Sequence, residues 1–204
     1  MMNEEIKKAG HPEKPEGNAG AQILEMMNEG HAPLRKWGLP HIEWTKEMRI
    51  LDVGCGGGAT IADMLNLAPD SVIDGIDYSD VSVEEARRRN AEYLGYRVDI
   101  KKADVTHLPF VENTFDLVTA VETVYFWPDI EKGIREIRRV LKPYGRFFIL
   151  NEGSDPDHTA FPEVDGFYRI YRPEELTALL KNCGMNAVRY YRGEGEYICV
   201  TGRK

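Results

Sequence analysis

The chain has 204 residues, of which 42% are hydrophobic and 29% charged, with a net charge of −8 and a pI of about 5.2. These values are typical of one globular domain, and the negative charge argues against a nucleic-acid partner because phosphate backbones are repelled. No apolar run approaches the ~20 residues that cross a membrane, and the polar N-terminus does not resemble a secretory signal. Three isolated cysteines lack metal-binding spacing and suit a reducing compartment. We therefore expect a cytoplasmic protein without a metal site and, since it has no long apolar run, without a membrane partner.

Residues 1–44 are predicted to form a flexible N-terminal arm and a helical lid, followed by a single domain over residues 45–204. The first twenty residues are polar and contain two prolines and three glycines, which favours a flexible arm. A short helix is predicted from Ala19 to Asn28, and one or two helical turns over His31–Gly38. Because these elements precede the first strand, we expect them on the outside of the domain or over its ligand cleft.

Apolar strand patterns then alternate with helical patterns. The predicted strands are Arg49–Val53, Val72–Asp77, Val98–Ala103, Phe115–Val121 and Arg146–Leu150. The predicted helices between them are Thr60–Leu67, Ser82–Leu94, with Ser82 and Glu85 as a capping box, and Asp129–Leu141. This alternation predicts a doubly wound, Rossmann-like α/β fold, with a parallel sheet, right-handed crossovers and helices on both faces.

The pattern changes after the fifth strand. An irregular loop is predicted from Asn151 to Phe167, followed by a helix over Pro173–Asn182. Strands over Met185–Tyr191 and Tyr197–Thr201 are separated by a short linker and must be antiparallel. We therefore expect a mostly parallel sheet that ends in an antiparallel hairpin, unlike the symmetric double unit of a dinucleotide dehydrogenase.

A glycine-rich turn follows the first predicted strand and allows a ligand to approach the backbone closely. Gly54-x-Gly56-x-x-Ala59 fits the dinucleotide fingerprint, whereas Asp52-x-Gly54-x-Gly56-x-Gly58 fits a motif of enzymes that bind S-adenosylmethionine. A connection without any ligand is the third interpretation. The acidic residue before the turn would repel a pyrophosphate and favour a ligand with an ammonium group.

Two further acids are predicted at the same edge of the sheet, where ligands of open α/β folds bind. Asp77 lies 23 residues after Gly54, and its carboxylate can accept hydrogen bonds from both hydroxyls of a ribose. Asp104 can accept from an adenine amino group while the N–H of Val105 donates to a ring nitrogen. The alternative for each carboxylate is a local turn-forming role.

With these residues in place, the chain resembles the class I S-adenosylmethionine-dependent methyltransferases, of the small type often called methyltransferase domain 11. The resemblance covers about half of the chain and implies the seven-stranded methyltransferase fold. The motifs that carry it are Ile50–Gly58, Gly75–Ser79, Lys102–Phe110, Phe115–Val118 and Val140–Arg146.

The resemblance implies S-adenosylmethionine as cofactor and a set of residues that bind it. These residues are Asp52, Gly54, Cys55, Gly56, Gly58, Asp77, Tyr78, Ser79, Ala103, Asp104, Val105, Val121 and Glu122. An early helix often closes over the cofactor in this family, so His31 and Trp37 are expected in a lid. Packing in the core is the alternative for Trp37.

Methyl transfer needs a base only if the acceptor must lose a proton before it attacks. The candidates are Glu122, Tyr125 and His158, although a solvated loop residue is the alternative for His158. The aromatic run over residues 125–127 is expected either to line an apolar acceptor pocket or to pack in the core. No nucleobase-methylating motif follows the fourth strand, which favours a small-molecule acceptor. The alternatives are an NAD-type nucleotide-dependent oxidoreductase and a non-catalytic protein that binds S-adenosylmethionine.

Overall fold

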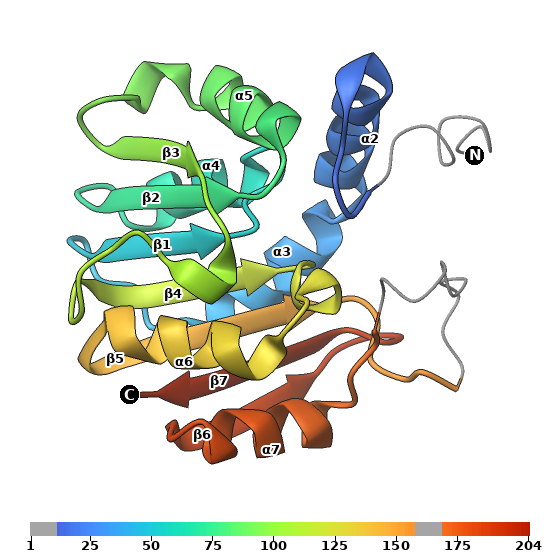
Figure 1. The fold of residues 1–204 in the computed structure, drawn as a ribbon, viewed down its shortest axis with the longest axis vertical. Helices are drawn as coiled ribbons and strands as arrows, with labels where there is room; N and C mark the ends of the chain where they lie inside the picture. The colour runs from blue at the N-terminus through green and yellow to red at the C-terminus, as the bar shows by residue number, and fades with distance from the viewer. Residues whose placement is uncertain (1–11, 158–168) are drawn as a thin grey trace.

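The structure is a computed structural model, and it describes residues 12–157 and 169–204 (Figure 1). Its strands are β1 (Arg49–Val53), β2 (Val72–Asp77), β3 (Val98–Lys102), β4 (Phe115–Val121), β5 (Leu141–Asn151), β6 (Asn186–Arg192) and β7 (Ile198–Arg203). Its α-helices are α2 (Gly17–Gly30), α3 (Ala32–Gly38), α4 (Ala59–Leu67), α5 (Asp80–Arg89), α6 (Ile130–Val140) and α7 (Pro173–Asn182). Among these helices, none is long and apolar enough to cross a bilayer.

The strands form one sheet in the order β3-β2-β1-β4-β5-β7-β6. The first five strands are parallel, and β7 lies antiparallel between β5 and β6. The predicted fold class is therefore confirmed, including the hairpin at the C-terminal end. Strand β1 has β2 on one side and β4 on the other, so the chain changes direction across the sheet at β1, where such folds bind ligands.

Two hydrophobic cores flank the sheet. Helices α6 and α7 pack on one face through residues such as Ile134 and Leu176. Helices α3, α4 and α5 pack on the other face through Leu34, Ile61 and Val83. Figure 1 shows α2 beyond the ends toward which β1 to β4 point, so the N-terminal segment stands at the ligand-binding edge.

Most predicted boundaries hold to within one or two residues, but the start of β5 is wrong in the prediction. The strand begins at Leu141 instead of Arg146, because Leu141 already pairs with Phe115. Tyr144 adopts a left-handed φ of 66°, and the register with β4 shifts beside it. The Lys-Pro-Tyr-Gly segment therefore ends the helix, as predicted, but it continues as an irregular strand.

The predicted cap of α5 is also wrong. Ser79 is the N-cap, and its hydroxyl accepts from the N–H of Ser82 at 3.2 Å. The helix ends at Arg89, and a short 3₁₀ turn over Ala91–Tyr93 follows. Both serines suit a cap, but Ser79 has a second contact, because its hydroxyl also donates to the carbonyl of Pro15 at 2.5 Å.

The N-terminal prediction is only partly covered by the described residues. The helix predicted from Ala19 to Asn28 is confirmed as the slightly longer α2. The first eleven residues of the predicted arm lie outside the described residues, as do residues 158–168 of the predicted loop after β5.

Candidate active site

A cavity of about 540 Å³ lies at the carboxyl ends of β1, β2 and β4, within the usual size range of small-molecule sites. The turn after β1 lines one side, and residues that follow β2, β3 and β4 line the others. Residues 12–15 and side chains from α2 and α3 complete the wall. The cavity therefore joins the glycine turn to the N-terminal segment.

The glycine turn is fixed to β2 by its own backbone. The N–H groups of Gly54 and Cys55 both donate to the carbonyl of Ile76, at 2.8 and 2.9 Å. Gly58 has a φ of 77°, and a Cβ there would lie 2.8 Å from the backbone Cα of Ala86. Glycine is therefore required by conformation and by space, and the turn keeps its backbone toward the cavity.

Asp77 is held at the wall of this cavity by two backbone donors. Its Oδ2 accepts from the N–H of Gly56 at 2.9 Å, and its Oδ1 accepts from the N–H of Ser79 at 2.9 Å. Burial raises the pKa of this carboxyl, and the two backbone hydrogen bonds oppose the shift. The side chain thus makes the turn contact of the alternative interpretation and also faces the cavity.

Asp52 lies behind the turn and not on the cavity wall. Its side chain is 1% exposed, and Oδ1 accepts from the hydroxyl of Thr119 at 2.6 Å. In the described part of the chain, Oδ2 has no hydrogen-bond partner. Burial raises the pKa of Asp52 to about 7, with a smaller contribution from the negative charge of Asp77. A positive charge above the turn would lower this pKa.

Asp104 takes part in a local turn and also lines the cavity. Its Oδ1 accepts from the N–H of Thr106 at 2.7 Å and caps the 3₁₀ turn Val105–His107. Its neighbours Ala103 and Val105 line the cavity as well. The two interpretations of this residue are therefore compatible, because a second carboxylate oxygen remains for a ligand.

Ten of the thirteen residues predicted to bind the cofactor line the cavity: Gly54, Cys55, Gly56, Asp77, Tyr78, Ala103, Asp104, Val105, Val121 and Glu122. The other three are Asp52, Gly58 and Ser79, which lie behind this wall and support it through the contacts described above. The structure thus brings most of the predicted set to one surface.

The N-terminal segment forms the opposite wall, through residues that include Leu24, Met27 and His31. Arg35 fixes this segment, because its Nε donates to Asp63 at 2.7 Å and its guanidinium donates to the carbonyl of Asn28 at 3.0 Å. The predicted lid residue Trp37 is not on this wall.

Trp37 is half-buried and packs against the edge of a hydrophobic core, which is closer to its alternative interpretation than to a lid over the cavity. Its ring centre lies 5.0 Å from that of His41 and 5.9 Å from that of Tyr197. These contacts place it beside the C-terminal strands, away from the cavity.

The three residues predicted as a general base occupy different environments. His158 lies outside the described residues. Tyr125 is buried, and its hydroxyl lies 3.1 Å from Oε1 of Glu122 and 2.9 Å from the N–H of Gly153, so it supports Glu122. Phe126 and Trp127 line the cavity, whereas Tyr125 does not. The aromatic run therefore divides between the cavity wall and the interior.

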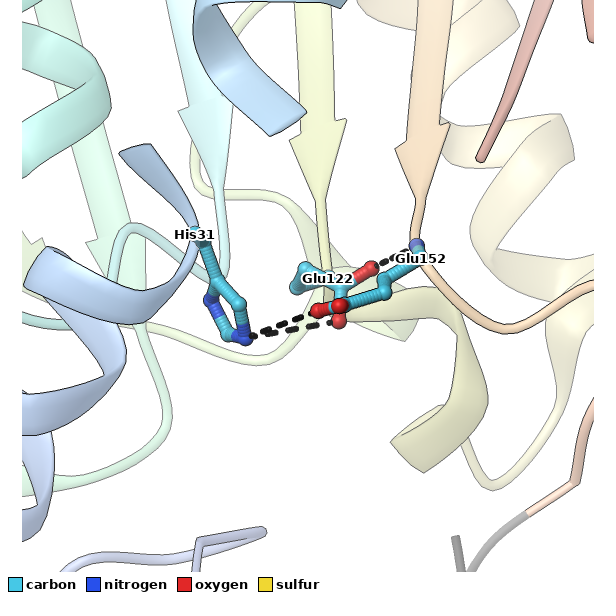
Figure 2. Close-up of side chains that lie close together, drawn as sticks. All are labelled: His31, Glu122 and Glu152. Carbon is cyan, nitrogen blue, oxygen red and sulfur yellow. Dashed lines mark hydrogen bonds and ion pairs between the residues drawn. The ribbon is translucent and has the colours of Figure 1, made fainter. Parts of the chain in front are cut away.

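Glu122 belongs to a group of side chains that we call the His31–Glu122–Glu152 cluster. Figure 2 shows the imidazole of His31, from the junction of α2 and α3, pointing toward carboxylates that follow β4 and β5. Nε2 of His31 lies 3.6 Å from Oε2 of Glu122 and 3.8 Å from Oε2 of Glu152. No sequence spacing indicates this cluster, because its members are far apart along the chain.

Burial dominates the electrostatics of the cluster. It lowers the pKa of His31 to about 4, with a smaller effect from the charge of Arg35. It raises the pKa of Glu122 to about 8, to which the negative charge of Glu152 contributes. The pKa of Glu152 is also raised by burial and by Glu196. A neutral imidazole thus lies beside two carboxyl groups that lack a positive neighbour in the cluster.

The fold and the cavity define a Rossmann-like protein with a cavity of small-molecule size at the switch point of its sheet. Comparison with known proteins identifies its family. Residues 51–149 match the model of the methyltransferase domain family. The chain belongs to the class I S-adenosylmethionine-dependent methyltransferases, a family whose cofactor is S-adenosylmethionine.

Several relatives share sequence with the chain. The sterol 24-C-methyltransferase of Aspergillus fumigatus is 31% identical over 159 residues, which are 72% of this chain and 42% of that protein. The ubiquinone/menaquinone biosynthesis C-methyltransferase of Geotalea daltonii is 34% identical over 137 residues, 66% of this chain and 57% of that protein. The chain thus spans about half the length of these relatives.

A solved structure shares the fold over the whole length. It is a methyltransferase from Aquifex aeolicus, described as dependent on S-adenosylmethionine, with a TM-score of 0.68 and 22% sequence identity. The alignment covers 100% of this chain and 99% of the other. The N-terminal helices and the C-terminal hairpin are therefore included in the shared architecture.

The residues of the cavity fit the cofactor. Gly56 has a φ of 50°, and among the described residues a Cβ there would meet only Leu24, at 3.7 Å, so these residues leave the space above the turn open to a ligand. Asp77 offers carboxylate oxygens beside this space, and the unpaired Oδ2 of Asp52 lies behind it. This combination suits an adenosine with a positively charged tail better than a pyrophosphate.

Proposed function

We propose that the protein transfers the methyl group of S-adenosylmethionine to a small-molecule acceptor. One observation carries the proposal: a single cavity is lined both by the predicted cofactor residues and by Glu122, Phe126 and Trp127, which follow β4. The cofactor and an acceptor can therefore share one enclosed space, as direct methyl transfer requires.

The cofactor residues have separate roles in this proposal. Asp77 accepts hydrogen bonds from the ribose hydroxyls, and Asp104 accepts from the adenine amino group while the N–H of Val105 donates to the ring. The backbone of the glycine turn packs against the amino-acid tail. Asp52, one layer behind the turn, favours the ammonium group through its charge or through water.

The bound cofactor supplies an electrophilic methyl group on a sulfonium. The residues of this chain position the acceptor, exclude water and accept a proton where the acceptor must lose one. Glu122 is the candidate for the last role, since it lines the cavity and is held by Tyr125. Its raised pKa, about 8, suits a group that exchanges a proton near neutral pH.

The lining of the cavity favours an acceptor with an apolar body. Leu24, Met27, Phe126 and Trp127 contribute apolar surface, while His31 and Glu122 contribute polar atoms at one end. Relatives named as a sterol methyltransferase and as a methyltransferase of ubiquinone/menaquinone biosynthesis are in keeping with such an acceptor. We therefore propose a partly apolar small molecule whose reacting atom faces Glu122.

Titration calorimetry with the full chain tests the cofactor part of the proposal. S-adenosylhomocysteine is expected to bind with one site, and NAD is expected to bind much more weakly. Tighter binding of NAD would overturn the proposal in favour of an oxidoreductase. A screen of small acceptors should then release S-adenosylhomocysteine from S-adenosylmethionine, and a complete lack of turnover would leave only a binding protein.

A matched pair of variants tests the assignment of the adenine site. Asp104→Ala is expected to weaken binding of S-adenosylhomocysteine by about 10-fold, the worth of one hydrogen bond to a charged group. Asp99→Ala is the control, because Asp99 is exposed on β3 and pairs with Lys101 away from the cavity. Equal effects of the two substitutions would contradict the adenine assignment.

A further inference from the structure

The atoms of the His31–Glu122–Glu152 cluster are spaced like the ligands of a metal ion. The two separations from Nε2 of His31, 3.6 and 3.8 Å, are too long for hydrogen bonds. Ligands at about 2.1 Å from a common ion lie about 3.4–3.6 Å apart when the angle between them is tetrahedral or trigonal. All three ligand atoms lie within 4.8 Å of one another. A common point therefore exists that one ion can occupy with small side-chain adjustments.

The second observation concerns how Glu122 is held. Its Oε1 accepts from the N–H of Glu152 and from the hydroxyl of Tyr125, which in turn contacts the backbone of Gly153. These donors fix the carboxylate and leave Oε2 directed at His31, as Figure 2 shows. Metal sites commonly hold the non-ligating atom of a ligand in this way, which orients the other atom toward the ion.

The charge of the cluster also calls for a cation. Glu122 is 9% exposed, and its carboxylate lies beside that of Glu152 with a neutral imidazole as the third member. Arg35 is the positive side chain near His31, but its guanidinium already contacts Asp63 and the carbonyl of Asn28. Glu152 is half-buried, and two neighbouring carboxylates of which one is buried are unfavourable unless protons or a cation neutralise them.

We propose that His31, Glu122 and Glu152 bind one divalent transition-metal ion. The site lies at the end of the cavity lined by His31 and Glu122, which we call the acceptor end. One imidazole and two carboxylates form a mixed donor set that suits Zn²⁺, Mn²⁺ or Fe²⁺ better than Mg²⁺ or Ca²⁺, which prefer oxygen ligands alone. With three protein ligands, at least one coordination position remains open, as in catalytic metal sites.

The open position indicates a class of acceptor. His31 and Glu122 both line the cavity, so a ligand atom on the ion would come from the molecule bound there. An oxygen donor, such as a hydroxyl or a keto group, matches such an ion. This part rests on the proposed methyl transfer, whereas the metal site itself does not.

Metal titration in the absence of cofactor tests the site. Metal-free full-length protein is titrated with Zn²⁺ and with Mn²⁺ by calorimetry, and Co²⁺ is added as a spectroscopic probe of the ligand set. One ion per chain is expected, with an increase in Tm on addition of metal, because an ion that binds only the folded state stabilises it.

Variants distinguish the cluster from adventitious binding. His31→Gln, Glu122→Gln and Glu152→Gln should each weaken binding at least 10-fold and remove the increase in Tm. His107→Gln and Glu131→Gln are the controls, since they change an imidazole and a carboxylate that lie outside the cluster. Tyr125→Phe should weaken binding by about 10-fold or more through Glu122, in the range known for such supporting residues.

The outcomes separate this proposal from the proposed function. A wild-type protein that binds no ion at millimolar metal, or cluster variants that bind as tightly as the controls, would overturn the metal site. If S-adenosylhomocysteine still binds in that case, methyl transfer stands and the cluster acts through protons alone. Circular dichroism of each variant shows that a loss of binding is not a loss of folding, and Tyr125→Phe provides a test that leaves all three ligands in place.

Discussion

The two ends of the cavity contain acids that are satisfied in different ways. At the end formed by β1 to β3, both carboxylate oxygens of Asp77 accept from backbone N–H groups at 2.9 Å. At the end formed by β4 and β5, Oε2 of Glu122 and Oε2 of Glu152 face His31 at distances beyond hydrogen bonding. The first end is preorganised by its own backbone, whereas the second is completed by what binds there.

The largest expected effect concerns the preorganised end, through Gly58→Ala. The substitution places a side chain at a φ of 77° and brings its Cβ to 2.8 Å from the backbone of Ala86. The left-handed conformation costs about 1–2 kcal/mol, and overpacking adds about 1–3 kcal/mol. We expect a loss of about 2–5 kcal/mol in the free energy of unfolding, measured by urea denaturation.

Gly95→Ala is the matched control for this variant. Gly95 has a similar φ of 83°, but a Cβ there meets no atom of the described residues within 4 Å. It should therefore show only the conformational cost, about 1–2 kcal/mol. Equal losses for the two variants would mean that the turn does not depend on close contact with α5.

The next effect is expected for Asp77→Ala, which removes the acceptor of two backbone donors and the proposed ribose ligand. Loss of hydrogen bonds to a charged group should weaken binding of S-adenosylhomocysteine by about 10- to 100-fold. Calorimetry measures the affinity, and Tm reports the accompanying change in the turn. An unchanged affinity would refute the ribose assignment.

A smaller effect is expected at the acceptor end, as a dependence of stability on pH. The pKa of Glu122 is raised from 4.5 to about 8, so between these values the folded state holds a proton that the unfolded state has released. The contribution of Glu122 to the free energy of unfolding is therefore greatest below pH 4.5 and is lost as the pH rises toward 8. Between pH 7 and 8, the expected loss is about 1 kcal/mol in metal-free and cofactor-free protein.

Glu122→Gln isolates this effect, because the amide does not titrate. Asp52, with a pKa of about 7, acts in the same direction, and His31, with a pKa of about 4, destabilises the fold as the pH falls below 6.5. Both groups remain in the variant, so the difference between the two urea-denaturation profiles belongs to Glu122. Parallel profiles from pH 5 to 8.5 would show that Glu122 is already ionised at neutral pH.

The same contrast explains what the sequence could predict. The order of strands and helices, the glycine turn and Asp104 follow from local patterns, because backbone geometry and short-range hydrogen bonds determine them. Asp77 follows from its place at the end of β2, although besides its local bond from Ser79 it accepts one from Gly56, 21 residues away. The His31–Glu122–Glu152 cluster is assembled from three distant segments, and no local pattern connects them. The one sequence feature that links two members is position, since Glu152 directly follows β5 as Glu122 directly follows β4.

The element boundaries that were predicted wrongly also depend on contacts between distant segments. The early start of β5 depends on pairing between Leu141 and Phe115, and the cap of α5 depends on the contact between Ser79 and Pro15. Trp37 suited a lid or the core equally well by sequence, and its neighbours His41 and Tyr197 decide for the core. In each case a tertiary contact selects among local structures of similar free energy.

The smallest effect is expected for Ser79→Ala. This residue lies where the N-terminal segment meets the end of the cavity formed by β1 to β3, which is the cofactor end. The hydroxyl of Ser79 caps α5 and donates to the carbonyl of Pro15, which lines the cavity. Loss of the cap should reduce the free energy of unfolding by about 1 kcal/mol. Loss of the bond to Pro15 should also speed the release of S-adenosylhomocysteine about 5-fold, the equivalent of one hydrogen bond of about 1 kcal/mol.

Asp129→Ala separates these two consequences. Asp129 caps α6 by accepting from the N–H of Lys132 at 2.9 Å, and it does not line the cofactor cavity. This variant should lose similar stability in urea denaturation but keep the wild-type release rate in stopped-flow measurements. If both variants released the ligand at the wild-type rate, residues 12–15 would be a fixed part of the wall and would not control release. Faster release from Ser79→Ala alone would instead assign the closure of the cofactor end to this one contact between segments 64 residues apart.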